Sequence, residues 1–143
     1  MTKYTHLIKL SVGSDTVEDL AAWQRLPQAQ SPDGYPWHIT RMWPKREDDV
    51  LNGGSIYWVI KGVIQCRNKI TRLDEVMGGD GIRRCAIVCD PELVRVEPTL
   101  KRAFQGWRYF KPEDAPADLG RVRDGEDALP ASLSAALAEI GVR

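Results

Sequence analysis

The run GSIYWVIKGVIQCRNKI at residues 54–70 limits the possible fold more than any other part of the sequence. Side chains alternate between the two faces of an extended chain, so one face would carry an almost entirely apolar series: Ile56, Trp58, Ile60, Gly62, Ile64, Cys66, Asn68 and Ile70. The opposite face starts apolar and becomes polar and basic: Tyr57, Val59, Lys61, Val63, Gln65, Arg67 and Lys69. We therefore predict a long strand, bent or bulged at Gly62, with the core on one face and a working surface on the other.

The second half of this run has a competing interpretation. Cys66, Ile70, Leu73 and Met77 are separated by four, three and four residues, which is also the spacing of one helical face. A strand is the favoured prediction for residues 63–76, and a helix is the alternative.

The remaining pattern predicts further short strands with few helices between them. Strand-like runs occupy residues 5–12, 37–43, 82–90, 93–98 and 104–110, with turns expected at 77–81 and 90–92. Because strands mostly follow strands, we predict an α+β fold: a small, strongly curved, mostly antiparallel sheet or barrel with two or three peripheral helices. We expect one domain over residues 1–120, then a polar linker and an amphipathic helix at 121–143 that packs on the same domain.

Charge is distributed unevenly along a chain whose formal net charge is zero. Residues 37–111 carry 14 basic and 9 acidic side chains, whereas residues 112–143 carry 3 basic and 7 acidic ones. A net charge of zero argues against a protein that binds nucleic acid through overall charge alone, but it allows a local basic patch. A surface for an anionic ligand is therefore expected in the middle of the chain.

Cysteine usage and the N-terminal sequence bear on the compartment. The odd number of cysteines, three, and the lack of a signal-peptide pattern predict reduced thiols and a cytoplasmic protein. No apolar run approaches the roughly 20 residues that cross a bilayer, so we expect no membrane partner. Cys85 and Cys89 lie in an apolar run, and no metal, phosphate-loop or hydrolase motif occurs. We predict no metal and no cofactor, with His6 and His38 in structural roles.

Aromatic and basic residues are interleaved in two parts of the chain. Nine of the eleven aromatic residues lie within residues 35–58 or 104–110. Flat rings beside cationic groups suit single-stranded nucleic acid, because a ring stacks on a base while the cation meets a phosphate. The alternative is a tryptophan-rich core with basic residues at its rim. The residues predicted to bind nucleic acid are Arg41, Trp43, Tyr57, Lys61, Arg67, Lys69, Trp107 and Arg108.

Three longer strings span much of residues 5–120: RMWPKREDDVLNGGSIYWVIKGVIQCRNKI, GDGIRRCAIVCDPELVRVEP and FQGWRYFKPEDAPADL. They resemble the bacterial family called domain of unknown function 1489, whose name implies no activity. The segment DDVLNGGSIYWVIKGVIQCR is also similar to the opening of ASCH, EVE and PUA-type domains. That resemblance implies a small curved β-barrel that binds RNA or modified bases. Ser55 follows the paired glycines where the ASCH pattern has lysine, and Gln65 stands where it has glutamate, which puts an inherited catalytic role in doubt.

Three functions are compatible with these patterns. The leading hypothesis is a nucleic-acid-binding module for RNA or an exposed base. The second is a small enzyme on a phosphorylated or nucleotide-like substrate, with Glu113, Asp114 or Asp118 as acid–base groups. The third is an interaction domain whose aromatic patch binds a partner and whose chain forms a homo-oligomer.

Overall fold

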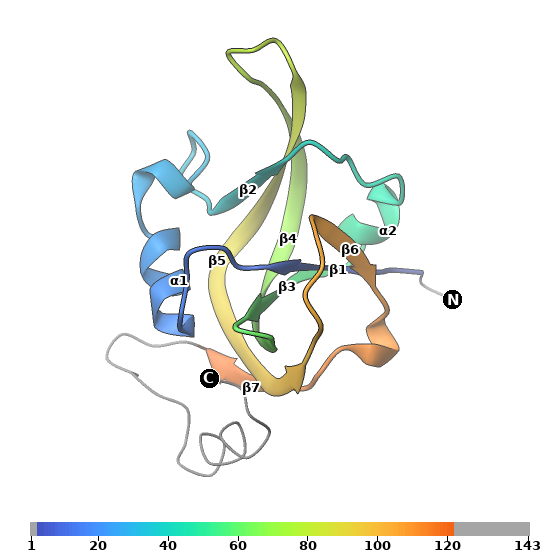
Figure 1. Cartoon of the computed structure of the whole chain (residues 1–143). Helices are drawn as coiled ribbons and strands as arrows, with labels where there is room; N and C mark the ends of the chain where they lie inside the picture. The colour runs from blue at the N-terminus through green and yellow to red at the C-terminus, as the bar shows by residue number, and fades with distance from the viewer. Residues whose placement is uncertain (1–2, 122–143) are drawn as a thin grey trace.

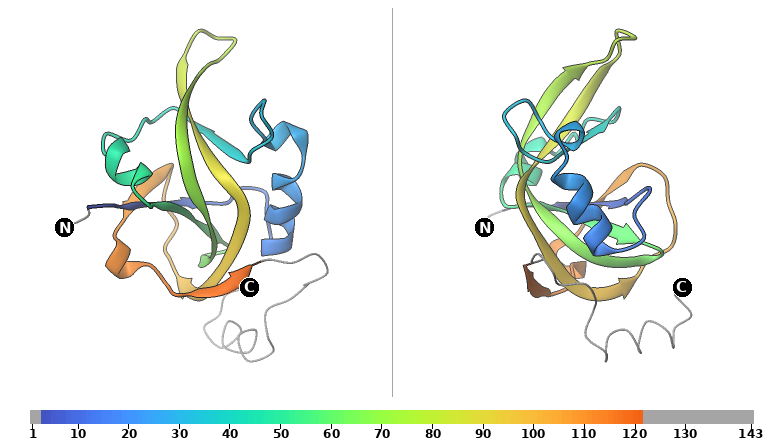
Figure 2. Two further views of the ribbon diagram at one scale, coloured as in Figure 1. Left: turned by 180° about the vertical axis from the view of Figure 1, so that it is seen from behind. Right: turned by 90° about the vertical axis from the view of Figure 1, so that its left-hand side faces the viewer.

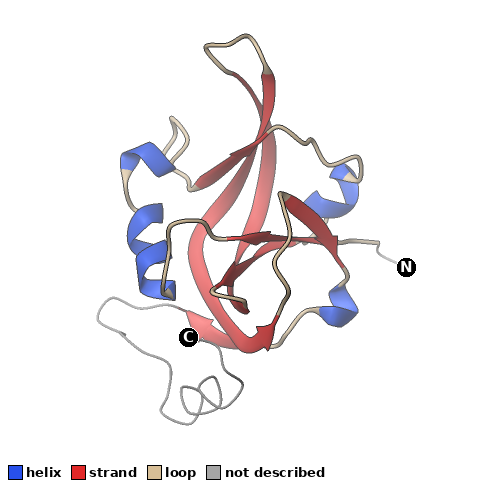
Figure 3. Cartoon of the chain, in the orientation of Figure 1, coloured by secondary structure: helices blue, strands red, loops and turns tan. Residues whose placement is uncertain are grey.

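The computed structural model describes the backbone of residues 3–121 and the side chains of residues 3–119, which form one strongly curved sheet with helices at its periphery (Figures 1 and 3). The strands are β1 (His6–Leu10), β2 (Trp37–Thr40), β3 (Ser55–Ile60), β4 (Val63–Met77), β5 (Arg83–Leu100), β6 (Trp107–Phe110) and β7 (Asp118–Arg121). The helices are α1 (Val17–Gln24) and α2 (Glu47–Leu51), with 3-10 turns at Pro27–Ala29 and Pro112–Asp114. The helix predicted near the C-terminus lies outside the described residues.

The strand order is β2-β5-β4-β3-β1-β6, and β7 pairs with a later part of the same edge of β5 that β2 uses. Strand β1 runs parallel to β3, and the other pairings are antiparallel. The sheet curls like half a barrel, with β2 and β6 as its two edges (Figure 2). The prediction of an α+β fold with a strongly curved sheet is therefore confirmed, although the sheet is mixed.

The run at residues 54–70 is a hairpin, so the prediction of one continuous strand bent at Gly62 is wrong. Lys61 and Gly62 connect β3 to β4, and both have positive φ angles, 51° and 79°. Two consecutive residues with positive φ form the tight turn whose twist matches that of the strands it joins. Residues 63–76 are a strand, as favoured, and the helical alternative is wrong.

Strand β5 is continuous where a turn was predicted at residues 90–92. Its pairing with β4 shifts register around Lys69, where Asp90, Pro91 and Glu92 lie between the paired residues Cys89 and Leu93. A second shift lies opposite Gln65 and contains Pro98. Proline lacks the amide hydrogen that a regular ladder needs, so both prolines fall at bulges, which also bend the strand. Proline therefore marks the bends of β5, not its ends.

Both faces of the β3–β4 hairpin are buried. The first core cluster includes Ile56, Trp58 and Ile60 together with residues of α1, β4 and β5. The second cluster contains Ile8, Tyr57, Val59, Ile64, Val96, Phe104 and Phe110. The face predicted to be a working surface is thus largely a second core, because the segment at residues 104–110 folds over it. Tyr57 is only 4% exposed and cannot offer a free ring for stacking.

A buried polar network fixes α1 against the sheet. Asn68, which is 0% exposed, exchanges two hydrogen bonds with the side-chain amide of Gln24, at 2.8 and 3.1 Å. Its Oδ1 also accepts from Nε1 of Trp58 at 2.9 Å, and its Nδ2 donates to the carbonyl oxygen of Asp90 at 3.1 Å. Buried amides are tolerated when they are fully paired, so this network sets the place of the helix.

Beyond this body the ends of β4 and β5 project as a two-stranded arm, visible at the top of Figure 1 and in both views of Figure 2. The arm pairs residues 74–77 with residues 83–86 and turns at 78–81. Its charges are matched: Arg83 pairs with Glu75 and Arg84 with Asp80. The core clusters contain residues only from the base of the arm, not from its tip.

We expect Asn68→Leu to lower the free energy of unfolding by about 3 kcal/mol, because it leaves the indole of Trp58 and the amide of Gln24 without partners in the core. Urea unfolding followed by far-UV circular dichroism measures the change. The control is Lys69→Ala at the neighbouring exposed position, expected within about 0.5 kcal/mol of the unmodified chain. Equal stabilities of the two variants would show that the network does not hold α1.

Candidate functional site

The eight residues predicted to bind nucleic acid are spread over several surfaces. Trp107 is buried, and its Nε1 donates to the carbonyl oxygen of Met42 at 2.8 Å. Trp43 is half-buried, with the guanidinium of Arg83 4.4 Å from its ring centroid. Arg41 is exposed in the same loop, between β2 and α2. These three predicted residues lie in the β2–α2 loop or against it.

Arg67, predicted as the principal cation, is engaged within the protein. Its Nε and Nη2 donate to both carboxylate oxygens of Asp118 at 2.8 and 2.7 Å, and its Nη1 donates to Oγ of Ser55 at 3.0 Å. The same hydrogen bonds hold the pKa of Asp118 below its usual value. An ionised, paired carboxylate is a poor proton donor or acceptor near neutral pH, so the acid–base role considered for Asp118 has little support.

The other predicted residues lie apart from one another. The ammonium group of Lys61, in the β3–β4 turn, is 3.7 Å from a carboxylate oxygen of Asp15. Lys69 is exposed on β4. Arg108 is exposed on β6, with its guanidinium 5.1 Å from the ring centroid of Phe104. No single basic face therefore forms from the predicted set within the described residues.

The cysteines are buried and free. Burial raises the pKa of Cys89 to about 12, and it also raises the pKa of Cys66 and of Cys85. Such thiols remain protonated and unreactive. Among residues 3–121 no cluster of three or more His, Cys, Asp or Glu side chains could hold a metal ion, and no helix there is long and apolar enough to cross a membrane.

Two of the hollows are lined by histidine and by a cationic side chain, which makes them the candidate sites. The first, the Arg67 hollow, is an open depression of about 500 Å³ lined by Tyr4, His6, Tyr57, Arg67 and Asp118. Nδ1 of His6 accepts from the backbone amide of Ser55 at 2.9 Å, and burial together with Arg67 lowers the pKa of His6 to about 4. The charges of this hollow neutralise one another, which leaves it weak attraction for an ion.

The second, the Trp hollow, is a narrower space of about 290 Å³ between α1, β1, β2 and β3. Its walls include Lys9, Trp23, Trp37, His38 and Trp58. Trp58 is buried, Trp37 is half-buried, and Trp23 is 48% exposed at the mouth. This volume lies at the lower end of the range for small-ligand sites, and the walls combine indole rings with polar side chains.

One ring nitrogen of His38, a residue that lines the Trp hollow, is unpaired within the described part of the chain. This atom, Nε2, is buried and has no hydrogen-bond partner among the described residues. The ring lies edge-on to that of Trp58, with centroids 5.8 Å apart. Burial and the nearby charge of Lys9 lower the pKa of His38 to about 4, so the ring is neutral, with one donor and one acceptor nitrogen. An unpaired buried polar atom destabilises the fold and often marks a functional position.

Lys9 is the cationic residue among the described residues that line the Trp hollow. Its Nζ lies 3.3 Å from the carbonyl oxygen of Leu10, a long hydrogen bond. Burial lowers the pKa of Lys9. An ammonium group has three N–H donors, so this hydrogen bond leaves donors for a ligand that enters the hollow.

Sequence reasoning missed the Trp hollow because its residues come from distant elements. Trp37 and Trp58 belong to the predicted aromatic windows, but Trp23 and Lys9 lie outside them. His38 was predicted to be structural. The density of tryptophan was the available signal. Alternation along residues 54–70 instead predicted a working surface on the face opposite to Trp58.

The family model for "Protein of unknown function (DUF1489)" matches residues 7–143, nearly the whole chain. The chain belongs to this family. Comparison of the DUF1489 chain with curated proteins gives no match, and neither does comparison with solved structures. The resemblance to ASCH, EVE and PUA-type domains stays a prediction from the sequence, and the function has to be argued from the site.

We expect the stability of this DUF1489 chain to fall as the pH drops from about 6.5 to about 4. The unfolded chain binds protons at both imidazoles in that range, whereas the folded chain does not, because the pKa of His6 and of His38 is lowered to about 4. The slope is at most about 1.4 kcal/mol per pH unit for each imidazole, and less for His6, which borders an open hollow. Urea titrations at several pH values measure it. His38→Leu should lose part of this slope, and an unchanged slope would contradict the assignment.

Proposed function

We propose that this DUF1489 protein is a nucleic-acid-binding module that holds one exposed base in the Trp hollow. The main support is His38, a neutral ring with a buried nitrogen that lacks a partner among the described residues, beside the indoles that line the hollow. A base suits this wall because it has a flat face that can stack on an indole and polar atoms along its edge that can pair with His38. The predicted function is therefore retained, but with a different set of residues.

The partial exposure of two rings supports a flat ligand. Trp23 and Trp37 leave part of their indoles accessible, whereas Trp58 closes the interior side and has its Nε1 bonded to Asn68. Stacking between a base and an aromatic side chain contributes roughly 1–3 kcal/mol, and it depends little on which base is present. A hydrogen bond from Lys9 or His38 to the edge of the base would add orientation.

Charge argues against the main alternative for an aromatic pocket, a quaternary ammonium ligand. Such cations bind over the faces of several rings. Here the ammonium of Lys9 lies in the same wall and close enough to His38 to lower its pKa. It would repel a cationic ligand, but it can donate to a keto oxygen or ring nitrogen of a neutral base.

We expect Trp23→Ala to weaken binding of short single-stranded RNA or DNA roughly 5- to 150-fold, through the loss of one stacking surface. Anisotropy of a labelled oligonucleotide at low and moderate salt measures the affinity. The matched control is Tyr35→Ala, which removes an exposed ring that lies outside the hollow. Absence of saturable binding at low salt, or equal losses in the two variants, would refute the proposed function.

His38→Leu should weaken binding while leaving the free energy of unfolding unchanged or raised by about 1 kcal/mol. The variant removes a buried polar atom that has no partner and keeps an apolar side chain in its place. Parallel measurements of affinity and urea stability separate the two effects. A loss of stability with unchanged affinity would mean that His38 has a structural role.

A further inference from the structure

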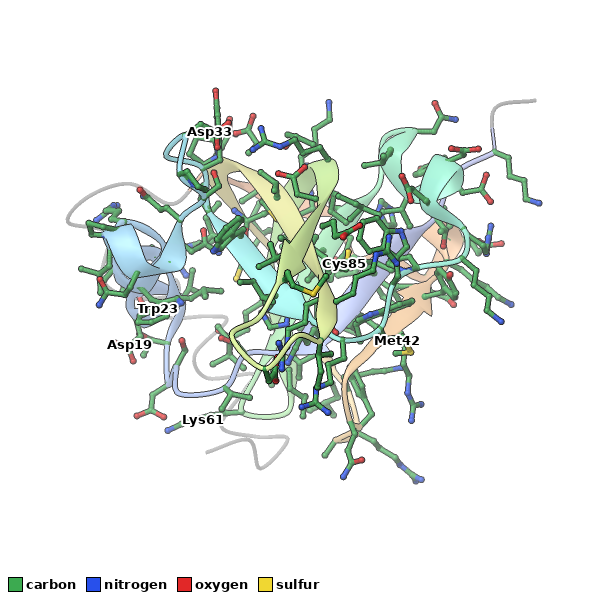
Figure 4. All side chains as sticks on the ribbon, turned by 90° about the horizontal axis from the view of Figure 1, so that it is seen from above. Asp19, Trp23, Asp33, Met42, Lys61 and Cys85 are labelled. Carbon is green, nitrogen blue, oxygen red and sulfur yellow. The ribbon has the colours of Figure 1, made fainter. Side chains whose placement is uncertain are left out.

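The surface on one side of the Trp hollow is unfavourable for a phosphate backbone. The start of α1 carries the exposed carboxylates Asp15 and Asp19 beside the exposed apolar residues Val12 and Leu26. Lys61, the nearby cation, is paired with Asp15. Figure 4 shows Asp19, Trp23 and Lys61 on one side of the molecule, with Met42 on the opposite side. Carboxylates repel phosphates, so a polynucleotide gains little there.

The loop beyond the other end of β2 carries exposed cations. Strand β2 forms part of the wall at Trp37 and His38 and leads into the loop that carries Arg41 and Lys45. Both side chains are exposed, and neither has an ion-pair partner within residues 3–119. Three residues of extended chain, at about 3.3 Å each, separate His38 from Arg41, or about 10 Å. A phosphate next to a bound base is within reach of such side chains.

This loop is held in place by β6. Nε1 of Trp107 donates to the carbonyl oxygen of Met42 at 2.8 Å, and the backbone amide of Arg46 donates to Oη of Tyr109 at 3.0 Å. The guanidinium of Arg46 lies 5.4 Å from the centroid of the Tyr109 ring. Met42 in the loop is 50% exposed and Tyr109 in β6 is 37% exposed, so apolar and aromatic surface adjoins the cations of the loop. Stacking surface beside fixed cations is what a single strand uses.

We infer that the ligand of the Trp hollow is a base within a single-stranded polynucleotide, not a free base or nucleoside, and that its backbone leaves the hollow along β2 towards Arg41 and Lys45. This inference rests on the proposed function and adds the course of the strand outside the hollow. Two phosphate contacts would come from Arg41 and Lys45, and the exposed carboxylate of Asp19 would disfavour a path across the start of α1.

The test compares the monomers uridine and adenosine with hexanucleotides of the same bases, for the full chain and for the double variant Arg41→Ala/Lys45→Ala. We expect the hexanucleotides to bind more tightly than the monomers. The double variant should lose roughly tenfold in affinity at low salt, and its salt slope should fall by about 1.4, or about 0.7 for each single-strand phosphate contact. Monomer binding should be unchanged in the double variant.

The matched control is Lys69→Ala/Lys111→Ala, which removes two exposed cations elsewhere and should keep the slope of the unmodified chain. All substituted positions are exposed, so folding should be retained, and circular dichroism checks it. If monomers bind as tightly as hexanucleotides and the Arg41/Lys45 variant keeps its slope, the backbone direction is wrong, while a base site sensitive to Trp23→Ala stands. If neither monomers nor hexanucleotides bind, both the inference and the proposed function fail.

Discussion

The arrangement of the Trp hollow depends on the hydrogen bonds of the Asn68 carboxamide. This carboxamide lies in the core without solvent contact, and it joins Gln24 of α1, the indole of Trp58 and the carbonyl of Asp90 in one network. A buried amide must find all its partners within the protein, so α1 can pack in one position only. The distance between the outer and inner indoles of the Trp hollow follows from this constraint, since Trp23 is carried by the helix and Trp58 by the sheet.

The class of fold could be predicted from the sequence because strand alternation and turn composition are local properties. The course of β3 and β4 could not, since the chain reverses at Lys61–Gly62 through two positive φ angles in a run that looks uninterrupted. Alternation also indicates which side chains share a face but not what covers that face. Here Phe104 and Phe110, more than forty positions away, cover Tyr57 and Val59.

The candidate site was harder to predict than the fold, because charge and accessibility depend on pairing between distant residues. Arg67 reads as a cation in the sequence, but Asp118 and Ser55 occupy its guanidinium. His38 reads as an ordinary strand residue, and only its surroundings show that Nε2 lacks a partner among the described residues. The sequence shows tryptophans interleaved with basic residues. Which face of the sheet each of these side chains lies on is decided by packing.

The projecting arm has a practical consequence for handling the protein. Its tip at Gly78–Gly81 lies beyond the core clusters, and its ion pairs close within the arm itself. Loop tips of this kind, rich in small residues and free of core contacts, accept insertions and chemical attachments with little effect on the body of a domain. A fluorophore or a surface tether placed there would report on the molecule, or immobilise it, at a point that lines neither hollow.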